Sequence, residues 1–451
     1  MEKVSLEEVL AYREKRVLRR QELQSKYRLP IACLGLNIPG EYKDFPWASR
    51  SFHEEIRSFT LALQAEGMAV TSQETEEEKA GYTAFFSIDA ESSALKTIAL
   101  RLEETHPLGR LFDIDIYEKN GEKISRDNIG ASGRLCLLCG ESAFVCGRNR
   151  SHSHEELHRA ALNIMEKYLK QELADKIAAA SMWAIMNEAA VTPKPGLVDR
   201  FNPGSHKDMD FFTFIDSASA IIPWFRFSAI TGFQSEKTPQ ALFDSLRAPG
   251  RMAEVLMKKA TGGINTHKGY IFSLGILSAA YGRLFRNNEN PELDALIDLV
   301  KAMTSSLGDD FKRSGHEVSH GEEVYKKSGI DGIRGEVSRG FPSVIEKSLP
   351  LLRSFLKDGC SINDAGIAAL LALIANTEDT NIIHRAGREI YEKIQKDLKT
   401  FFDMSPGKEE ILEKAARMDR EFINKNISPG GSADLLGVTF FLYHFKFKRR
   451  N

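Results

Sequence analysis

The sequence has no long apolar run, few cysteines and no excess of charge of either sign. Its longest apolar stretches, 365–375 and 435–445, fall well short of the roughly 18 residues that a membrane-spanning helix requires. The N-terminus is charged from its second residue and lacks the apolar core of a secretory signal. With 61 Lys plus Arg against 63 Asp plus Glu, the net charge of -2 gives no electrostatic footprint for nucleic acid. The 5 cysteines, an odd and small count, indicate reduced thiols. We therefore expect a soluble, cytoplasmic protein with neither a membrane nor a nucleic-acid partner.

The spacing of apolar residues changes character near residue 155. Before it, helical stretches alternate with short strands, and after it nearly all of the periodicity is helical. Ser5 and Glu8 form a capping box that opens the first helix. Strand-like patterns lie at 31–36, 82–88 and 111–117. We predict a multidomain protein, with an α+β domain over 1–170 whose sheet is mixed or antiparallel, a charged helix at 153–173, and a larger all-α domain over 171–451.

Two charged stretches of the first domain are expected to face solvent. The acidic stretch 74–79 is interpreted as a loop. The first helix has one basic side, for which a solvated face is favoured over a docking face for an acidic partner. The residues of that side are Arg13, Lys15, Arg16, Arg19 and Arg20.

Two aspartates share one face of the strand expected at 111–117. Asp113 and Asp115 alternate with apolar residues that point to the opposite face. A pair of carboxylates at this spacing can hold a hard cation such as Mg²⁺, which then clamps a nucleotide phosphate. Arginines suit a polyphosphate because each presents a bidentate fork, and those nearby are Arg110, Arg126 and Arg134. The plain alternative is an exposed, acidic strand face without a ligand.

Three of the cysteines crowd into 136–146. Cys136, Cys139 and Cys146, with His152 or His154 as a fourth ligand, give a spacing that is compatible with a tetrahedral zinc site. The first two cysteines flank a pair of leucines, and buried reduced cysteines behave as small hydrophobes. Packed free thiols are therefore favoured, with structural zinc as the alternative.

The strings NIPG at 37–40, HPLGRLFDID at 106–115 and RLCLLCGESAFVCGRNRSH at 134–152 carry a resemblance. Over roughly 5–168 the chain resembles the apo-citrate lyase phosphoribosyl-dephospho-CoA transferase family. The resemblance implies that a serine of the citrate lyase acyl carrier subunit attacks the α-phosphorus of a triphosphoribosyl-dephospho-CoA and expels pyrophosphate. Asp113 and Asp115 then correspond to metal ligands, and Arg110 and Arg134 to groups that neutralise charge.

The fold implied by this resemblance is nucleotidyltransferase-like. Such enzymes commonly carry a Gly-Ser pair before the aspartates and a third carboxylate later in the chain. Here Gly109 is not followed by serine. Three acids each fit the place of the third carboxylate, namely Glu118, Asp127 and Glu141.

Four loops rich in glycine and aspartate precede helices in the second domain. They lie at 192–210, 262–269, 378–385 and 428–434. The first carries more charges of both signs than a purely structural loop needs. The second places glycines and a lysine at a helix start, where free N–H groups bind anions. Together these loops predict a polyphosphate and metal site at one end of a helical bundle.

The strings TPKPGLVDRFNPGSHKDMD, GGINTHKG, EDTNIIHRAG and SPGGSADLLG within these loops resemble the ATP:dephospho-CoA triphosphoribosyl transferase family over roughly 172–451. The resemblance implies that ATP and 3′-dephospho-CoA combine with loss of adenine. It also implies a transition state with oxocarbenium character, which nearby carboxylates stabilise, and a triphosphate that needs Mg²⁺ and cations.

Roles in the second domain are assigned by position in these strings. For Mg²⁺ binding or cation stabilisation we expect Asp199, Asp208, Asp210, Asp379 and Asp434. For the phosphates we expect Lys194, Arg200, Gly262, Gly263, Asn265, Lys268, Arg385, Gly430 and Gly431. His206 or His267 is expected to act as general acid or base. The alternative for Asp208 and Asp210 is helix capping alone.

The combined expectation is a bifunctional transferase that makes and then installs the citrate lyase prosthetic group. One alternative is a Mg²⁺-dependent N-glycosyl hydrolase, because aspartate-rich helix starts would serve water as well as a sugar hydroxyl. It would be fused to a zinc-type module that recruits the carrier without chemistry. Another alternative is that the same chemistry serves the carrier of malonate decarboxylase.

Overall fold

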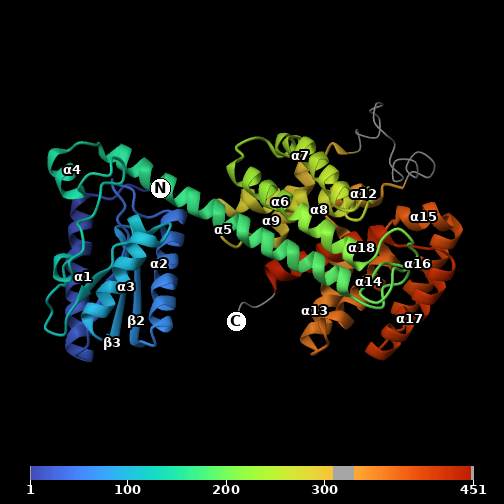
Figure 1. Ribbon diagram of the computed structural model, residues 1–451, viewed down its shortest axis with the longest axis horizontal. Coiled ribbons are helices and arrows are strands. Elements are labelled where there is room, and N and C mark those ends of the chain that lie inside the picture. Colours follow the sequence, from blue (N-terminus) through green and yellow to red (C-terminus); the bar gives the residue numbers. More distant parts are fainter. Residues whose placement is uncertain (1, 308–329, 448–451) are drawn as a thin grey trace. The chain divides into compact units, whose positions relative to one another are not determined.

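The computed structural model describes residues 2–307 and 330–447, and it divides into two compact units, Met1–Gln171 and Glu172–Asn451 (Figure 1). The helical pattern expected through 308–329 lies outside the described residues. The first unit contains a sheet with helices, and the second is built from helices in its described part. The predicted fold class, an α+β domain followed by a larger helical domain, is confirmed.

The first unit is organised around one sheet of four strands in the order β2-β3-β1-β4, and all of its pairings are antiparallel. Its strands are β1 (Ile31–Leu34), β2 (Ala69–Glu78), β3 (Gly81–Asp89) and β4 (Asp115–Tyr117). Its helices are α1 (Leu6–Tyr27), α2 (Pro46–Ala65), α3 (Ser92–Thr105), the short η1 (Gly109–Leu111) and η2 (Asp127–Ile129), and α4 (Ala143–Asn149).

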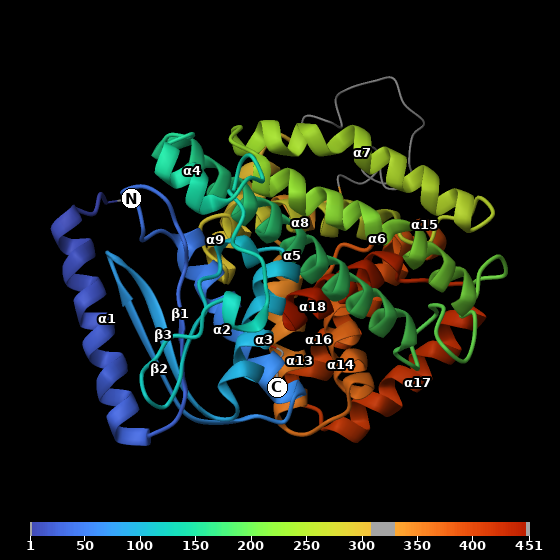
Figure 2. The ribbon, with the colours of Figure 1, turned by 60° about the vertical axis from the view of Figure 1, so that its left-hand side comes forward.

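Apolar side chains cover both faces of the sheet. On one face, α2 and α3 contribute Phe52, Phe59 and Leu95 to the main core. On the other, Leu23 of α1 packs with Cys33 of β1 and with residues of β1 and β3. Figure 2 shows α1 on one side of the strands, and α2 and α3 on the other. The capping box of Ser5 and Glu8 is present at the start of α1, as the sequence predicted.

The acidic stretch 74–79 is not a loop, because 74–78 belong to β2. Glutamate is a poor strand former, but the register with β3 and ion pairs with α1 outweigh that propensity. Arg19 lies 2.6 Å from Glu74, and Lys15 lies 2.5 Å from Glu78. Arg16, Arg19 and Arg20 are thus partly buried against the sheet, whereas Arg13 and Lys15 are exposed, as expected for a solvated face.

The second unit consists of packed helices. The chain enters it through α5 (His154–Ala190), which continues past the expected end at residue 173 because no helix breaker intervenes. The helices that follow are α6 (Phe211–Gln234), α7 (Pro239–Ala260), α8 (Lys268–Phe285), α9 (Leu293–Met303), α12 (Gly332–Ser338), η3 (Ser343–Ser348), α13 (Leu349–Lys357), α14 (Ile362–Asn376), α15 (Thr380–Ala386), α16 (Arg388–Asp403), α17 (Lys408–Asn424) and α18 (Gly430–Lys446).

The core of the second unit surrounds α14. Every residue of 365–375 is buried, so this apolar run is a core helix. Both α18 and α16 pack against it. Within residues 2–307 and 330–447, no helix has the length and apolar character needed to cross a membrane.

Candidate active sites

A cavity of about 1970 Å³ opens in the first unit. Its lining includes residues 37–40 after β1, Gly109 and Arg110 of η1, and residues 134–137. These are parts of the three strings on which the resemblance of this unit depends. Drug-sized ligands occupy roughly 300–1,000 Å³, so the cavity has room for a ligand the size of a coenzyme A derivative.

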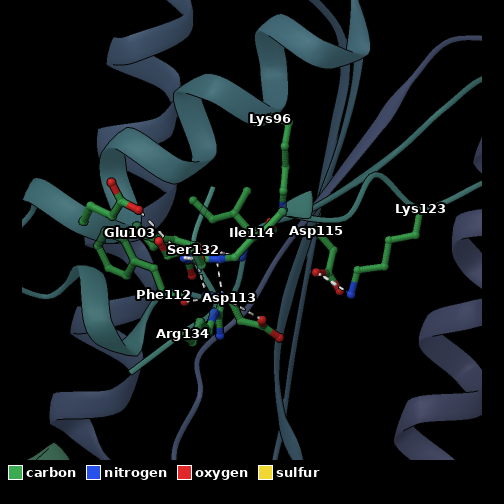
Figure 3. A network of polar contacts seen from close by, with 12 residues as sticks. Lys96, Glu103, Phe112, Asp113, Ile114, Asp115, Lys123, Ser132 and Arg134 are labelled. Atoms are coloured by element: carbon green, nitrogen blue, oxygen red, sulfur yellow. Dashed lines mark hydrogen bonds and ion pairs between the residues drawn. The ribbon is translucent and has the colours of Figure 1, made fainter. Parts of the chain in front are cut away.

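Arg134 connects two carboxylates beside this cavity, as Figure 3 shows. Its guanidinium donates to Glu103 Oε1 at 2.7 Å and to the Phe112 carbonyl at 3.1 Å, and lies 3.1 Å from Asp113 Oδ1. Arg126 also donates to Glu103. Arg126 also lies 3.8 Å from Glu104, so nearby carboxylates offset both arginines. The cavity lining nevertheless contains more basic than acidic side chains, including that of Arg110, which suits an anionic ligand.

Asp115 begins β4 and lies two residues from Asp113, with the buried Ile114 between them. Its carboxylate lies 2.7 Å from Lys123 Nζ and 3.8 Å from a nitrogen of Arg16 on α1. The strand is shorter than the expected 111–117, because residues 109–111 form the turn η1. Both aspartates nevertheless lie at alternate positions, and both have cationic neighbours.

The carboxylate that contacts Asp113 directly is Glu55 of α2, which the sequence analysis did not identify. Glu55 is fully buried, and its Oε1 accepts the backbone N–H of Asp113 at 3.2 Å. Its Oε2 has no hydrogen-bond partner among the described residues. Burial, together with the nearby Asp113 carboxylate, raises the pKa of Glu55 well above its usual value. The signal was present, because Glu55 lies three residues after Phe52 and four before Phe59 on the buried face of α2.

The three alternatives for a third acid lie elsewhere in the unit. Glu118 follows β4, Asp127 lies in η2, and Glu141 follows the second cysteine. The backbone carbonyl of Glu141 accepts the N–H of Cys136 at 2.6 Å. Glu55 thus joins these three as a candidate, and it has the closest described contact with Asp113.

Cys136, Cys139, Cys146 and His152 form one cluster, whose ligand atoms all lie within 4.8 Å of one another. Cys136 Sγ and Cys146 Sγ are 3.4 Å apart, and all of the cysteines are free. Burial alone would raise the pKa of Cys136, but hydrogen bonds from the backbone N–H groups of Cys139 and Leu138 lower it to about 6. His152, rather than His154, completes the set.

In the second unit, the four glycine- and aspartate-rich loops meet around the start of α18. His206 Nε2 lies 2.9 Å from Ser428 Oγ, which connects the first loop with the fourth. Asp379 Oδ2 accepts the N–H and the hydroxyl of Ser432 at 2.8 and 2.9 Å, which connects the third. Gly269 packs so closely against the Asp434 carboxylate that an added Cβ would overlap it, which connects the second.

Asp434 lies at this junction close enough to Glu188 and Asp379 for their charges to act on it. Asp379 is fully buried, and it caps α15 through the N–H groups of Asn381 and Ile382. Burial, reinforced by the Glu188 and Asp379 charges, raises the pKa of Asp434 well above its usual value. Burial also raises the pKa of Asp379. Burial thus disfavours the charged form of both aspartates at this junction.

Lys194 is the cation buried nearest to these acids. Its Nζ donates to Glu188 Oε1 at 2.6 Å, and the two side chains are only 1% and 5% exposed. Sequence reasoning missed Glu188 because a single glutamate inside a long helix gives no local signal. The residues around it, Ala184, Ile185 and Ala189, are buried, so Glu188 lies on an inward face of α5.

The two candidate histidines have different environments. His267 is buried, its Nδ1 lies 2.6 Å from Ser217 Oγ, and its Nε2 has no hydrogen-bond partner among the described residues. Burial and the Lys194 charge lower the pKa of His267 to about 3. Burial and the Arg385 charge lower the pKa of His206 as well. Both rings are therefore neutral near pH 7, which favours hydrogen-bond or base roles over that of a proton donor.

The remaining aspartates of the first loop have local partners. Asp199 is buried and accepts from Thr192 Oγ1 at 2.7 Å and from the N–H groups of Phe201 and Asn202, so it organises its own loop. Asp210 caps α6 through Thr213. Asp208 is exposed and lies 3.8 Å from His206. The capping alternative thus describes the contacts of Asp210.

Apart from the buried Lys194, the expected phosphate-binding residues are exposed or partly exposed. Gly262, Gly263 and Asn265 are exposed before α8, and Lys268 at its first turn lies 3.5 Å from Glu254. Arg200 lies over the Phe201 ring. Arg385 donates to the Ser205 carbonyl at 3.3 Å. Gly430 and Gly431 approach the Asn381 and Asp379 side chains so closely that a Cβ would press on them.

Comparison with known proteins matches each unit to a separate family. Residues 4–168 match the model described as apo-citrate lyase phosphoribosyl-dephospho-CoA transferase. Residues 174–451 match the model described as ATP:dephospho-CoA triphosphoribosyl transferase. Together the matches cover both of the stretches on which the resemblances depend.

Three curated relatives agree with this division. The chain is 31% identical to "Protein CitXG" of Haemophilus influenzae over 98% of this chain and 97% of the relative. It is 32% identical to "Protein CitXG" of Leuconostoc mesenteroides over the same shares. It is 38% identical to a 2-(5''-triphosphoribosyl)-3'-dephosphocoenzyme-A synthase of Pectobacterium atrosepticum, over 62% of this chain and 91% of the relative. The chain therefore belongs to the family of fused transferases in which an apo-citrate lyase phosphoribosyl-dephospho-CoA transferase precedes an ATP:dephospho-CoA triphosphoribosyl transferase.

Proposed function

We propose that this chain makes the citrate lyase prosthetic group in its helical unit and attaches it to the acyl carrier subunit with its first unit. The observation that carries the proposal is the junction at the start of α18. There, four loops distant in sequence bring the carboxyl groups of Glu188, Asp379 and Asp434 together with Lys194 and His267.

In the helical unit, the 2′-hydroxyl oxygen of 3′-dephospho-CoA bonds to the anomeric carbon of the ATP ribose. The bond from that carbon to adenine breaks, and adenine leaves with the hydroxyl proton. Positive charge develops on the ribose in the transition state. The acids of the junction stabilise it, because a positive charge favours the ionised Asp434 carboxylate, which burial and the neighbouring acids disfavour.

In the first unit, a serine oxygen of the carrier bonds to the α-phosphorus of the triphosphoribosyl group, and the bond to pyrophosphate breaks. The positively charged wall of the cavity, with Arg110, Arg126 and Arg134, neutralises the phosphates. Asp113 lies at the edge of this wall through its contact with Arg134, and is a third exposed. Glu55, beneath it, holds the backbone N–H of Asp113 and fixes the aspartate position.

Each site offers carboxylates that could hold Mg²⁺ together with the phosphates of a bound substrate. Mg²⁺ in nucleotide enzymes is held by one or two carboxylates and by substrate phosphates, rather than by a complete protein cage. In the helical unit, Asp434 and Asp379 would be the ligands, because a divalent cation would favour the ionised carboxylates that burial disfavours. In the first unit, Asp113 and Asp115 would be the ligands. The ion would supply further neutralisation of the phosphates.

Mass spectrometry of the carrier tests the proposal. The full chain is incubated with ATP, 3′-dephospho-CoA, Mg²⁺ and the apo form of the citrate lyase acyl carrier. The expected result is a carrier heavier by one phosphoribosyl-dephospho-CoA group, with adenine and pyrophosphate released in equal amounts. Adenine release with ribose triphosphate as the only other product would show a hydrolase instead. A parallel incubation with the malonate decarboxylase carrier identifies the cognate partner.

A further inference from the structure

The segment 118–153 of the first unit has little regular structure and little core of its own. Within it the structure contains only η2 and α4 as helices, three and seven residues long. Several of its large apolar side chains are exposed, namely Leu135, Leu138, Phe144 and Val145. Segments that bury so little apolar surface usually need a cross-link or a metal to hold one conformation.

The backbone around the first two cysteines forms a tight hairpin. The N–H of Cys136 donates to the Glu141 carbonyl at 2.6 Å, and the N–H of Ala143 donates to the Arg134 carbonyl at 2.8 Å. Gly140, directly after Cys139, has a φ of +75°, which favours glycine. The backbone N–H groups of Leu138 and Cys139 are hydrogen-bonded to the sulfur of Cys136. This hairpin brings the sulfurs of Cys136 and Cys139 within 4.8 Å of each other.

The helix α4 and the residues after it supply the other two side chains. Cys146 lies on α4, and His152 follows three residues after its end. All four ligand atoms lie within 4.8 Å of one another. In a tetrahedral site with Zn–S bonds of about 2.3 Å, neighbouring sulfurs lie about 3.8 Å apart. The sulfurs of Cys136 and Cys146 are 3.4 Å apart, which is close to that value.

Packed thiols do not account for two features of the cluster. Cys139 is exposed, so it is not a buried apolar group. His152 Nε2 is buried and has no hydrogen-bond partner among the described residues. A disulfide between Cys136 and Cys146 would leave both features as they are. A metal ion bound by all four residues satisfies the buried nitrogen and uses the exposed thiol.

This cluster lies next to the residues that organise the proposed transfer site. Arg134 is two residues before Cys136, and its guanidinium contacts Glu103 and Asp113. The carbonyls of Leu135 and Cys136 accept hydrogen bonds from Arg110. Cys136, Cys146 and His152 also line the cavity. Whatever fixes this hairpin therefore fixes two arginines of the cavity wall.

We propose that Cys136, Cys139, Cys146 and His152 bind one zinc ion, which holds the hairpin that carries Arg134 against the Asp113 carboxylate. Four protein ligands fill a tetrahedral site, so the ion is structural and has no position open for substrate. The metal site itself stands on the cluster geometry. Only its effect on carrier labelling rests on the proposed function.

Metal content of the full-length protein is the first test. Purified under reducing conditions, the wild-type chain is expected to carry one zinc ion by mass spectrometry of the elements. After exchange with Co²⁺ it should show the visible bands of tetrahedral cobalt and a thiolate charge-transfer band. A chain without bound zinc or cobalt overturns the proposal. Thiol titration of the unfolded, unreduced protein should find five free thiols. A result of three would reveal a disulfide and would also overturn the proposal.

Substitutions then identify the ligands. Cys139→Ser and His152→Ala should each lower zinc affinity by about 10–100-fold or more, whereas Cys360→Ser and His154→Ala should leave one ion bound. Unchanged zinc in Cys139→Ser contradicts the assignment. His152→Cys keeps a zinc ligand, and should retain both the ion and carrier labelling. In Cys139→Ser, adenine release by the helical unit should persist while carrier labelling falls; retained labelling after zinc loss would remove the positioning role but not the metal site.

Discussion

The candidate carboxylates of the two units have different surroundings. In the first, Asp113 and Asp115 each have a nearby cationic side chain, Arg134 or Lys123, so the charges are balanced within the protein. In the helical unit, Asp379 is held mainly by N–H groups and a hydroxyl, and the pKa of Asp434 is raised. The first site is therefore organised before a ligand arrives, whereas in the second burial disfavours the ionised carboxylates until a cation or a positively charged transition state is present.

Breaking the buried ion pair between Lys194 and Glu188 should have the largest effect. Lys194→Met leaves the Glu188 carboxylate buried without its cation, which is expected to cost about 3–5 kcal/mol of unfolding free energy. Denaturant unfolding monitored on the helical unit measures this. The matched control is Lys425→Met, which removes an exposed pair with Glu421 and should cost less than about 1 kcal/mol. Equal costs for the two variants would contradict the buried role.

Removing the paired aspartate of the first unit should separate the two reactions. Asp113→Asn keeps the size of the side chain but loses its charge, and carrier labelling should fall about 10²–10³-fold. Adenine release by the helical unit should stay unchanged. Asp89→Asn, at the exposed end of β3, is the control. Labelling at the wild-type rate in Asp113→Asn would favour a carrier-recruiting module without chemistry.

Steric pressure on Asp434 should weaken the helical site without unfolding it. In Gly269→Ala, the new Cβ overlaps the Asp434 carboxylate and displaces it. We expect adenine release to slow about tenfold, about 1.4 kcal/mol of barrier. Gly407→Ala serves as the control, because its Cβ would meet only the end of the Glu410 side chain at 3.7 Å. An unaffected rate in Gly269→Ala would show that the position of Asp434 does not matter.

The smallest expected effect is a pH-dependent difference in stability between the wild-type chain and Asp434→Asn. A carboxyl whose folded pKa is raised contributes stability that is fully present below its unfolded pKa, about 4, and is lost as the pH rises through the folded pKa. Asp434→Asn stays neutral, so it should raise the melting temperature of the helical unit at pH 8 by about 2–4 °C for each kcal/mol recovered. Scans at pH 5 and pH 8 measure this. Parallel curves for wild type and variant would argue against a raised pKa.

Local features of the fold were predictable because local contacts determine them. The Ser5–Glu8 capping box needs only neighbouring residues, and it is present as predicted. A second capping pair, also predicted, opens α5. The Ser153 N–H donates to the Glu156 carboxylate at 2.8 Å, and the Glu156 N–H donates to the Ser153 hydroxyl at 3.1 Å. In contrast, the strand through Glu74 depends on β3 and on Arg19 of α1, which are distant in sequence. No local pattern reveals such a pairing.

The candidate site residues also fall into two groups, those that the sequence indicated and those that only the packing revealed. Asp113, Asp379 and Asp434 lie in recognisable strings, so sequence placed them on its candidate list, where their roles stay predictions. Glu55 and Glu188 lie inside helices that carry several other charged residues, and only the packing shows that these two face inward. The cysteine cluster was visible as a spacing, but its compactness and the unpartnered nitrogen of His152 come from the structure.

The position of α18 in the chain has a consequence for biosynthesis. Because residues 428–434 join the other three loops, no functional junction exists until this stretch has left the ribosome. The first unit, within residues 1–171, has its own core and emerges much earlier. During translation, the catalyst that installs the group would therefore mature before the catalyst that manufactures it.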